Sequence, residues 1–252
     1  MSFTAEVKDE LSRVSATCSH CDKAVLAALV RIEGTLFVSG KNRYRVEIAT
    51  DAPSVARLVI KLLHEIYRLK TNLTVRRSVL HKTPNYLIEV PAQPQLAAAL
   101  VDMGVLSAEG GLVLGVSEQL VAKDCCAASY LRGAFLGSGF VSDPRGDFHF
   151  EVIVETEELA DGLVELLARK NIKARIMQRR NSYMVYLKSG SAILEFLALA
   201  GAHQSALAME NARVIKSVRN DVNRQTNAEI ANQAKTSRAA IDQIRAIRQV
   251  VE

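Results

Sequence analysis

The chain has 252 residues, with 32 basic against 27 acidic side chains, a formal net charge of +5 and a sequence pI near 9.1. Hydrophobic residues make up 49% and charged residues 23%, which fits a soluble globular protein and excludes an intrinsically disordered one. No apolar run reaches the about 18 residues that span a bilayer, and the polar N-terminus has no secretion signal. We therefore expect a cytoplasmic protein with no membrane partner.

Two copies of one unit follow each other along the chain. Leu26–Gly34 (LAALVRIEG) matches Leu131–Gly139 (LRGAFLGSG) at an offset of 105 residues, and the same offset pairs Leu62 with Leu167. An offset kept over this length predicts a tandem repeat, in which each copy is one supersecondary unit.

Each copy shows the same order of apolar periodicities, beginning with an apolar helix that ends at glycine. Period-two alternation then predicts strands, and period-3.6 patterns predict amphipathic helices. In the first copy we expect helices at 22–34, 53–68 and 94–103 and strands at 43–48, 73–79 and 85–91. In the second copy we expect helices at 125–138, 157–169 and 190–200 and strands at 149–154, 173–179 and 182–188.

The order of these elements predicts an α+β fold, in which pseudo-twofold tandem repeats place helices on antiparallel sheets and a helical tail follows. Residues 225–249 are expected to form two helices broken near Lys235–Thr236, with Ser237 capping the second. The expected segments are an N-terminal helix (1–21), a first repeat (22–110), a second repeat (111–202), a linking helix (203–222) and a partial helix-turn-helix domain (223–252).

The positive charge is clustered on the second strand pair of each repeat. Residues 66–88 and 169–188 each contain several basic side chains and no acid. These runs are either solvated sheet faces or two basic surfaces that symmetry places along a DNA duplex, where they would neutralise phosphates. Lys173, Arg175 and Arg179 share strand parity and should project from one sheet face. The candidate DNA-binding residues are Arg76, Arg77, Lys173, Arg175, Arg179 and Arg180 in the repeats, with Lys235, Arg238, Arg245 and Arg248 in the tail.

The nonapeptide Leu26–Gly34 resembles the LAGLIDADG signature of homing endonucleases, and Leu131–Gly139 resembles it more weakly. The whole chain, including the stretch Ser129–Leu136 (SYLRGAFL), is similar to the WhiA family. That resemblance implies a degenerate LAGLIDADG domain joined to a C-terminal helix-turn-helix, and a nucleoid-associated, sequence-specific transcriptional regulator of sporulation, cell division and chromosome segregation. Family members continue past the position of Glu252, which implies that the main recognition helix is missing here.

The endonuclease chemistry needs one carboxylate from each central helix, just before its final glycine, to hold divalent metal. The first copy has Glu33 at this position, whereas the second has Ser138, and a hydroxyl is a poor substitute for a carboxylate. We therefore expect no catalytic residues and no enzyme activity, with Glu33 and Ser138 vestigial. One alternative is a metal-dependent DNA endonuclease that uses Glu33 with Asp143 or Asp124.

A further alternative is a protein-interaction scaffold, in which the acidic segment 143–165 docks another transcriptional regulator. That segment holds eight acids against Arg145 alone.

The four cysteines lie just before the two central helices. Cys18 and Cys21 precede the first, Cys125 and Cys126 precede the second, and the repeat offset pairs Cys21 with Cys126. We expect no cofactor, because buried free cysteines are common. The alternative is a structural zinc ion held by four converging sulfurs, with His20 in reserve.

Overall fold

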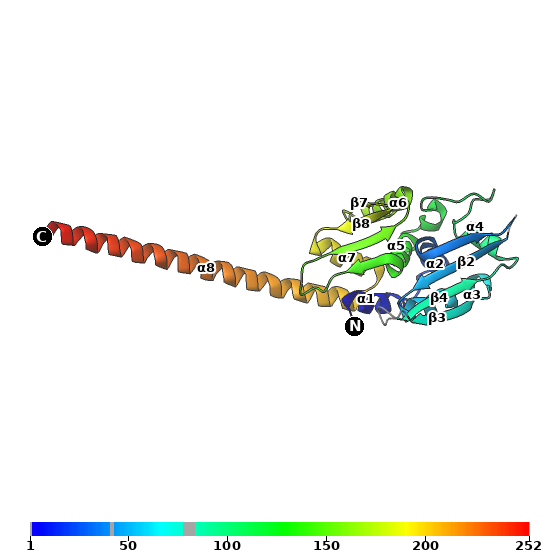
Figure 1. The fold of residues 1–252 in the computed structure, drawn as a ribbon, viewed down its shortest axis with the longest axis horizontal. Coiled ribbons are helices and arrows are strands. Elements are labelled where there is room, and N and C mark those ends of the chain that lie inside the picture. Colours follow the sequence, from blue (N-terminus) through cyan, green and yellow to red (C-terminus); the bar gives the residue numbers. More distant parts are fainter. Residues whose placement is uncertain (1, 41–42, 78–83, 252) are drawn as a thin grey trace. The chain divides into compact units, whose positions relative to one another are not determined.

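The computed structural model describes residues 2–40, 43–77 and 84–251 and confirms the α+β fold with two tandem units (Figure 1). Within the two repeats, the predicted helices and strands appear within about three residues of their expected bounds; residues 78 and 79 of the strand expected at 73–79 lie outside the described residues. The helix expected at 1–21 is shorter than predicted, because it ends at Leu11. After α1 (Phe3–Leu11), the first unit comprises α2 (Ser19–Glu33), β1 (Gly34–Val38), β2 (Tyr44–Thr50), α3 (Pro53–Tyr67), β3 (Asn72–Arg77), β4 (Pro84–Val90) and α4 (Leu96–Asp102). After a 3-10 turn η1 (Glu118–Val121), the second comprises α5 (Asp124–Ser138), β5 (Gly139–Val141), β6 (Phe150–Val154), α6 (Glu157–Ala168), β7 (Arg175–Arg179), β8 (Ser182–Leu187) and α7 (Gly190–Ala200).

Both units build the same antiparallel sheet. The strand order is β1-β2-β4-β3 in the first and β5-β6-β8-β7 in the second, so the repeat seen in the sequence is also a repeat of topology. Alternation sets the two faces: Tyr44, Val46 and Ile48 of β2 are buried, whereas the intervening Arg45 and Glu47 are partly exposed. Each sheet thus has one face packed against helices and one that carries polar side chains.

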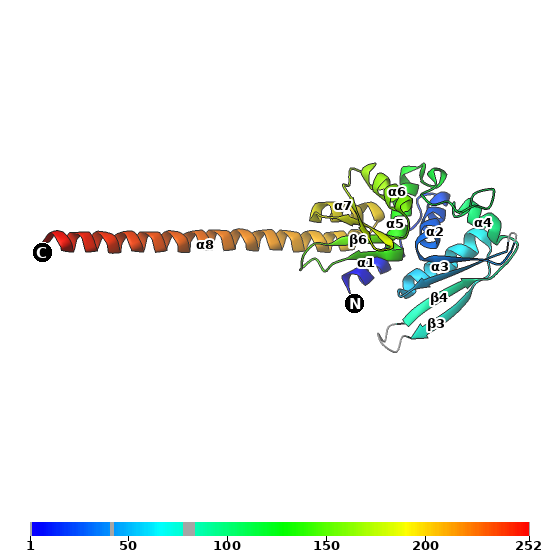
Figure 2. The same ribbon diagram turned by 45° about the horizontal axis from the view of Figure 1, so that its top comes forward.

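Helices α2 and α5 pack against each other over their length and join the two units (Figure 2). Small residues make this approach possible: a Cβ atom on Gly133 would lie 2.5 Å from the Val25 carbonyl oxygen and 2.9 Å from the Ala28 Cβ. On its other side α5 contributes Phe135, whose ring lies 5.3 Å from that of Phe150 in β6. The central helices are therefore both the interface between the repeats and part of the shared core.

The last helix, α8, runs from His203 to Val251. The chain divides into two compact parts: Met1–Met209, which contains both repeats, and Glu210–Glu252, which contains the greater part of α8. The predicted break near Lys235–Thr236 is wrong: the helix is continuous there, and the Thr236 hydroxyl donates to the Asn232 carbonyl 3.0 Å away, within the helix. Residues 203–252 contain no glycine or proline, so no residue in this stretch is a strong helix breaker.

The helix-turn-helix expected at 223–252 has no turn among its described residues, 223–251. The exposed side chains of α8 include several aliphatic ones, among them Val218, Val222, Ile230, Ile241 and Ile244. Among the described residues, no helix is both long enough and apolar enough to cross a membrane.

Candidate functional site

The paired helices α2 and α5 bring the two predicted signature positions together at their C-terminal ends. Glu33 is the last residue of α2 and Ser138 the last of α5, and each is followed by a glycine. A Cβ atom on Gly137 would lie 3.2 Å from the Glu33 Cγ, which places the end of α5 directly against the Glu33 side chain. The two signature positions therefore lie at neighbouring helix ends.

Ser138 is bound into the adjacent sheet. Its hydroxyl accepts a hydrogen bond of 3.1 Å from the Ile153 amide and donates to the Ile153 carbonyl. The Ser138 oxygen therefore serves to attach the end of α5 to β6.

A cation that the sequence analysis did not identify lies at the same place. Lys8 of α1 is 8% exposed, and its Nζ donates to the Gly137 carbonyl oxygen at 2.6 Å. Burial lowers the pKa of Lys8, while the charges of Asp51 and Glu33 oppose that shift. Burial likewise raises the pKa of Glu33, the Lys8 charge lowers it, and Asp51 raises it again. The site therefore combines one buried ammonium with two carboxylates.

A signal for Lys8 was present in the sequence. Thr4, Val7, Lys8 and Leu11 recur at the spacing of one helical face, and Val7, Lys8 and Leu11 are buried. A lysine on the apolar face of a short helix is a candidate for a buried ion pair.

The other two acids considered for an endonuclease site have different partners. Asp124 starts α5, at the end opposite Ser138, and binds Lys170 with an oxygen–nitrogen distance of 2.8 Å. Asp143 binds Arg145 at 2.7 Å, and these hydrogen bonds lower the pKa of Asp143 to about 2. Neither carboxylate is paired with Glu33 in the described part of the chain.

The candidate basic residues of the second repeat lie at the edge of its sheet. Arg175 and Arg179 stand on the same side of the edge strand β7 and are exposed, as predicted from their parity. Lys173 lies before the strand, so its predicted place in the same row is wrong. Arg180 lies in the following turn with a φ of 43°. The structure thus brings only two of these four residues into one strand row.

In the first unit, Arg76 is exposed on the edge strand β3, opposite Asn85 of β4. Arg77 ends the strand, and its side chain lies outside the described residues. Strand alternation puts Arg76 on the same sheet face as Glu89 and Glu47.

Acidic groups lie nearer the middle of both polar sheet faces, which the sequence analysis did not foresee. Arg45 binds Glu47 at 3.2 Å and Glu89 at 3.5 Å, and its guanidinium lies 4.2 Å from the centre of the Phe37 ring. In the second sheet, the Nε2 of His149 lies 2.8 Å from a Glu151 oxygen. The available positive charge is therefore at the sheet edges.

The candidate residues of the tail all lie on α8, in the unit Glu210–Glu252. Lys235, Arg238, Arg245 and Arg248 are exposed, and no second helix supports them within the described part of this unit.

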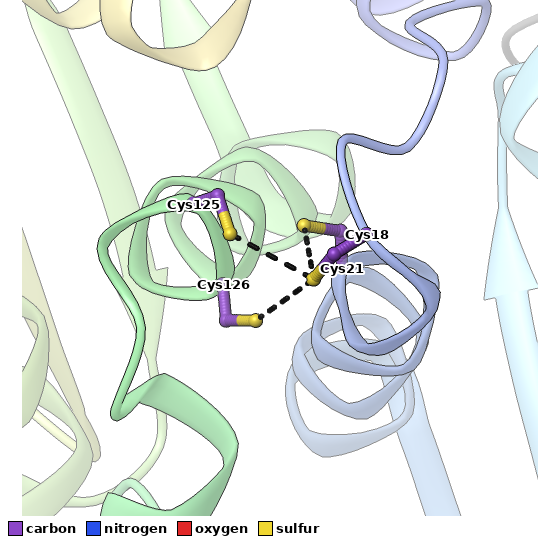
Figure 3. Close-up of side chains that lie close together, drawn as sticks. All are labelled: Cys18, Cys21, Cys125 and Cys126. Atoms are coloured by element: carbon purple, nitrogen blue, oxygen red, sulfur yellow. Dashed lines mark hydrogen bonds between the residues drawn. The ribbon is translucent and has the colours of Figure 1, made fainter.

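The four cysteines meet at the N-terminal ends of α2 and α5 (Figure 3). The Cys18 sulfur lies 3.4 Å from that of Cys21, 3.7 Å from that of Cys125 and 3.7 Å from that of Cys126. All four sulfurs lie within 4.8 Å of one another, and all four thiols are free. The convergence predicted from the repeat is confirmed.

The thiols of this cluster differ in acidity. Hydrogen bonds, first from the Cys21 side chain and then from the His20 backbone, lower the pKa of Cys18 to about 6. Burial, followed by the neighbouring sulfurs, raises the pKa of Cys126 to about 12. Hydrogen bonds with Cys21 and Cys18, followed by burial, raise the pKa of Cys125. Cys18 therefore ionises more readily than Cys125 or Cys126.

Comparisons with known proteins match both units. Residues 19–106 match the family model of the WhiA N-terminal LAGLIDADG-like domain, and residues 127–219 match that of the WhiA LAGLIDADG-like domain. The chain is 40% identical over 250 residues to the probable cell division protein WhiA of Desulforamulus reducens, covering 98% of this chain and 78% of that protein. It is 39% identical to that of Symbiobacterium thermophilum, covering 99% and 80%.

Solved structures show the same fold. The crystal structure of full-length DUF199/WhiA from Thermatoga maritima has a TM-score of 0.74 at 24% identity, covering 98% of this chain and 78% of that one. A variant of the homing endonuclease I-DmoI, described in complex with its target DNA and Mg, has a TM-score of 0.51 at 14% identity, covering 72% and 96%. The identity to the curated relatives, over nearly the whole chain, shows that this chain belongs to the WhiA family.

Proposed function

We propose that this chain is a DNA-binding transcriptional regulator of cell division, chromosome segregation and sporulation, built on an endonuclease fold that no longer cleaves DNA. The observation that carries the loss of cleavage is the contact of the Lys8 ammonium with the Gly137 carbonyl, beside Glu33. In this fold that is where the two signature acids would hold a divalent cation.

The residues at the paired helix ends do not fit Mg²⁺. This ion binds oxygen ligands in near-ideal octahedral geometry and is usually held through carboxylates. Asp51 is near Glu33, but it follows β2 and is not on a central helix; the Ser138 hydroxyl is bound to Ile153, and the neighbouring Lys8 ammonium would repel a cation. We therefore derive no metal-assisted step and assign no catalytic residue.

The fold supports duplex DNA as the partner, because the endonuclease I-DmoI, which shares it, is described in complex with its target DNA. The ion-paired acids near the middle of the sheets restrict phosphate contacts to the sheet edges and to α8. We assign such contacts to Arg76, Arg175, Arg179 and Arg180 and to the tail residues Lys235, Arg238, Arg245 and Arg248. A nucleoid-associated location in the cytoplasm follows from this role.

Fluorescence anisotropy of the full chain with a labelled duplex tests the DNA partner. We expect saturable binding that requires no divalent metal. The logarithm of Kd should rise linearly with the logarithm of the salt concentration, because each neutralised phosphate releases condensed counterions. The absence of saturable binding at about 50 mM salt, where phosphate contacts are strong, would refute a DNA partner.

A charge-neutralised pair locates the contact. The double variant Arg175→Gln/Arg179→Gln should bind more weakly and lose about two units of salt slope, since two phosphate contacts are removed. Arg57→Gln/Lys61→Gln, which removes the same charge from the exposed side of α3, is the matched control and should keep the slope. Equal losses in both pairs would contradict the assignment to β7.

Nicking of supercoiled plasmid separates the regulator from an endonuclease. The wild-type chain should leave plasmid intact in Mg²⁺ or Mn²⁺. Cleavage that is lost in Glu33→Gln would overturn the proposal and establish the endonuclease alternative.

A second function, docking of another regulator, is favoured by the exposed acids of α6. Glu157, Asp161 and Glu165 recur every four residues along this helix, with Glu158 beside them. A partner that stays bound when Arg76, Arg77, Arg179 and Arg180 are reversed to glutamate, while DNA binding is lost, would separate this docking role from DNA binding.

A further inference from the structure

Four sulfurs from the two repeats form one compact cluster whose geometry is that of a tetrahedral ion site. Zinc–sulfur bonds of about 2.3 Å in a tetrahedron place neighbouring sulfurs about 3.8 Å apart. Cys18 lies 3.4 to 3.7 Å from its three neighbours, and no pair of sulfurs exceeds 4.8 Å. We propose that Cys18, Cys21, Cys125 and Cys126 bind one structural zinc ion that fastens the first repeat to the second.

Ordinary packing does not account for this arrangement. Cys18 is the N-cap residue of α2, with extended backbone (φ −147°, ψ 164°), yet its side chain makes no capping hydrogen bond. It is directed instead at the other three sulfurs (Figure 3). Cys18 and Cys125 are only partly buried, so an ion can reach the cluster from solvent.

The surroundings suit a negatively charged tetrathiolate centre. The cluster lies at the N-termini of both α2 and α5, where the helix dipoles favour negative charge. The guanidinium of Arg132 is buried, hydrogen-bonds Ser129 and the Ala200 carbonyl, and interacts electrostatically with Cys21. A fixed positive charge behind the ligands offsets part of the charge that four thiolates bring.

The donor type selects the ion. Four thiolates in a closed tetrahedral set are the composition of structural zinc sites, which leave no position open for substrate. Of the two carboxylates adjacent to the cysteines in sequence, Asp124 is paired with Lys170, and Asp22 interacts electrostatically with Arg132. The site is therefore expected to be structural and separate from the paired helix ends that carry Glu33.

Metal analysis of the full chain, expressed in zinc-containing medium and purified without chelator under reducing conditions, tests the proposal. We expect about one zinc per chain, released in step with titration of four thiols by a mercurial reagent. Less than about a tenth of an equivalent of zinc, iron in its place, or four sulfurs paired as disulfides in protein isolated without oxygen would overturn it.

Variants locate the ligands. Cys21→Ser/Cys126→Ser should lose the zinc, whereas His20→Gln, adjacent in sequence but outside the ligand set, should keep it. Loss of metal in His20→Gln would overturn the four-sulfur assignment.

If the double cysteine variant does not fold, Co²⁺ replacement in the wild-type chain provides the same test. A tetrahedral tetrathiolate gives intense visible absorption and a sulfur-to-cobalt charge-transfer band. Wild-type chain that shows neither after zinc removal and Co²⁺ addition would contradict the site.

Discussion

The contact between Gly133 and the backbone of α2 makes a sharp test of the packing that joins the two repeats. A Cβ atom added by Gly133→Ala would lie 2.5 Å from the Val25 carbonyl oxygen and 3.0 Å from the Val25 Cα, whereas ordinary contacts begin at 3.4 Å. Because these are backbone atoms, the strain is relieved only by moving α5 away from α2. Overpacking of this kind costs about 3 kcal/mol, and the better helix propensity of alanine returns about 1 kcal/mol. The net loss of stability is thus about 2 kcal/mol.

For a chain of this size that loss corresponds to a melting temperature lower by about 4–8 °C. Thermal unfolding followed by far-ultraviolet circular dichroism measures it. Gly137→Ala in the same helix is the matched control, because its new Cβ would meet only the side chains of Glu33 and Ile32, at 3.2 Å, which can move. We expect it within about 1 kcal/mol of wild type. Equal stability of the two variants would refute the close approach of α2 and α5 at Gly133.

Two further predictions concern α1 and its partners. Because the folded-state pKa of Glu33 is raised above 4.5, the wild-type chain loses stability as pH rises from about 4.5 to the folded pKa, where the buried carboxyl ionises. The melting temperature of Glu33→Gln relative to wild type should therefore rise over this pH range and then level off. A constant difference in melting temperature from about pH 4 to 8 would contradict this. Glu10 accepts hydrogen bonds from the backbone N–H groups of Gln204 (2.7 Å) and Ser205 (3.0 Å) at the start of α8, so Glu10→Ala should lower stability by about 1–2 kcal/mol, measured as the urea midpoint, with Glu10→Gln intermediate. An unchanged midpoint in Glu10→Ala would show that these hydrogen bonds contribute nothing.

The tandem fold could be predicted from the sequence because each helix and strand has its own periodic pattern of apolar residues, and the same series of patterns occurs twice. Period-two and period-3.6 patterns located the strands and helices, and the offset of 105 residues related the two units. The same offset placed Cys21 and Cys126 symmetrically, which is why the sulfur cluster could be predicted as well.

The features that were missed are tertiary or depend on a weak local signal. The hydrogen bond from Lys8 to Gly137 joins residues 129 positions apart, and no periodicity encodes such a pair. The pairing of Arg45 with Glu89 depends on strand register, which single-strand patterns leave open. The turn near Lys235 was predicted from a helix-turn-helix-like spacing of residues that has no glycine at the turn. Without a helix-breaking residue, the helix propensity of the stretch prevails and the helix continues.

Lys8 has one more consequence, which concerns competition between ions. Its ammonium is carried on the packed helix α1, so it is present beside Glu33 in every folded molecule and does not depend on solution concentration. A short tether already corresponds to an effective concentration on the order of millimolar, and a packed helix to more. Soluble Mg²⁺ would have to displace a cation that is part of the chain. Restoring an acid through Ser138→Asp alone would therefore not recreate a metal centre; α1 would have to give up its lysine first.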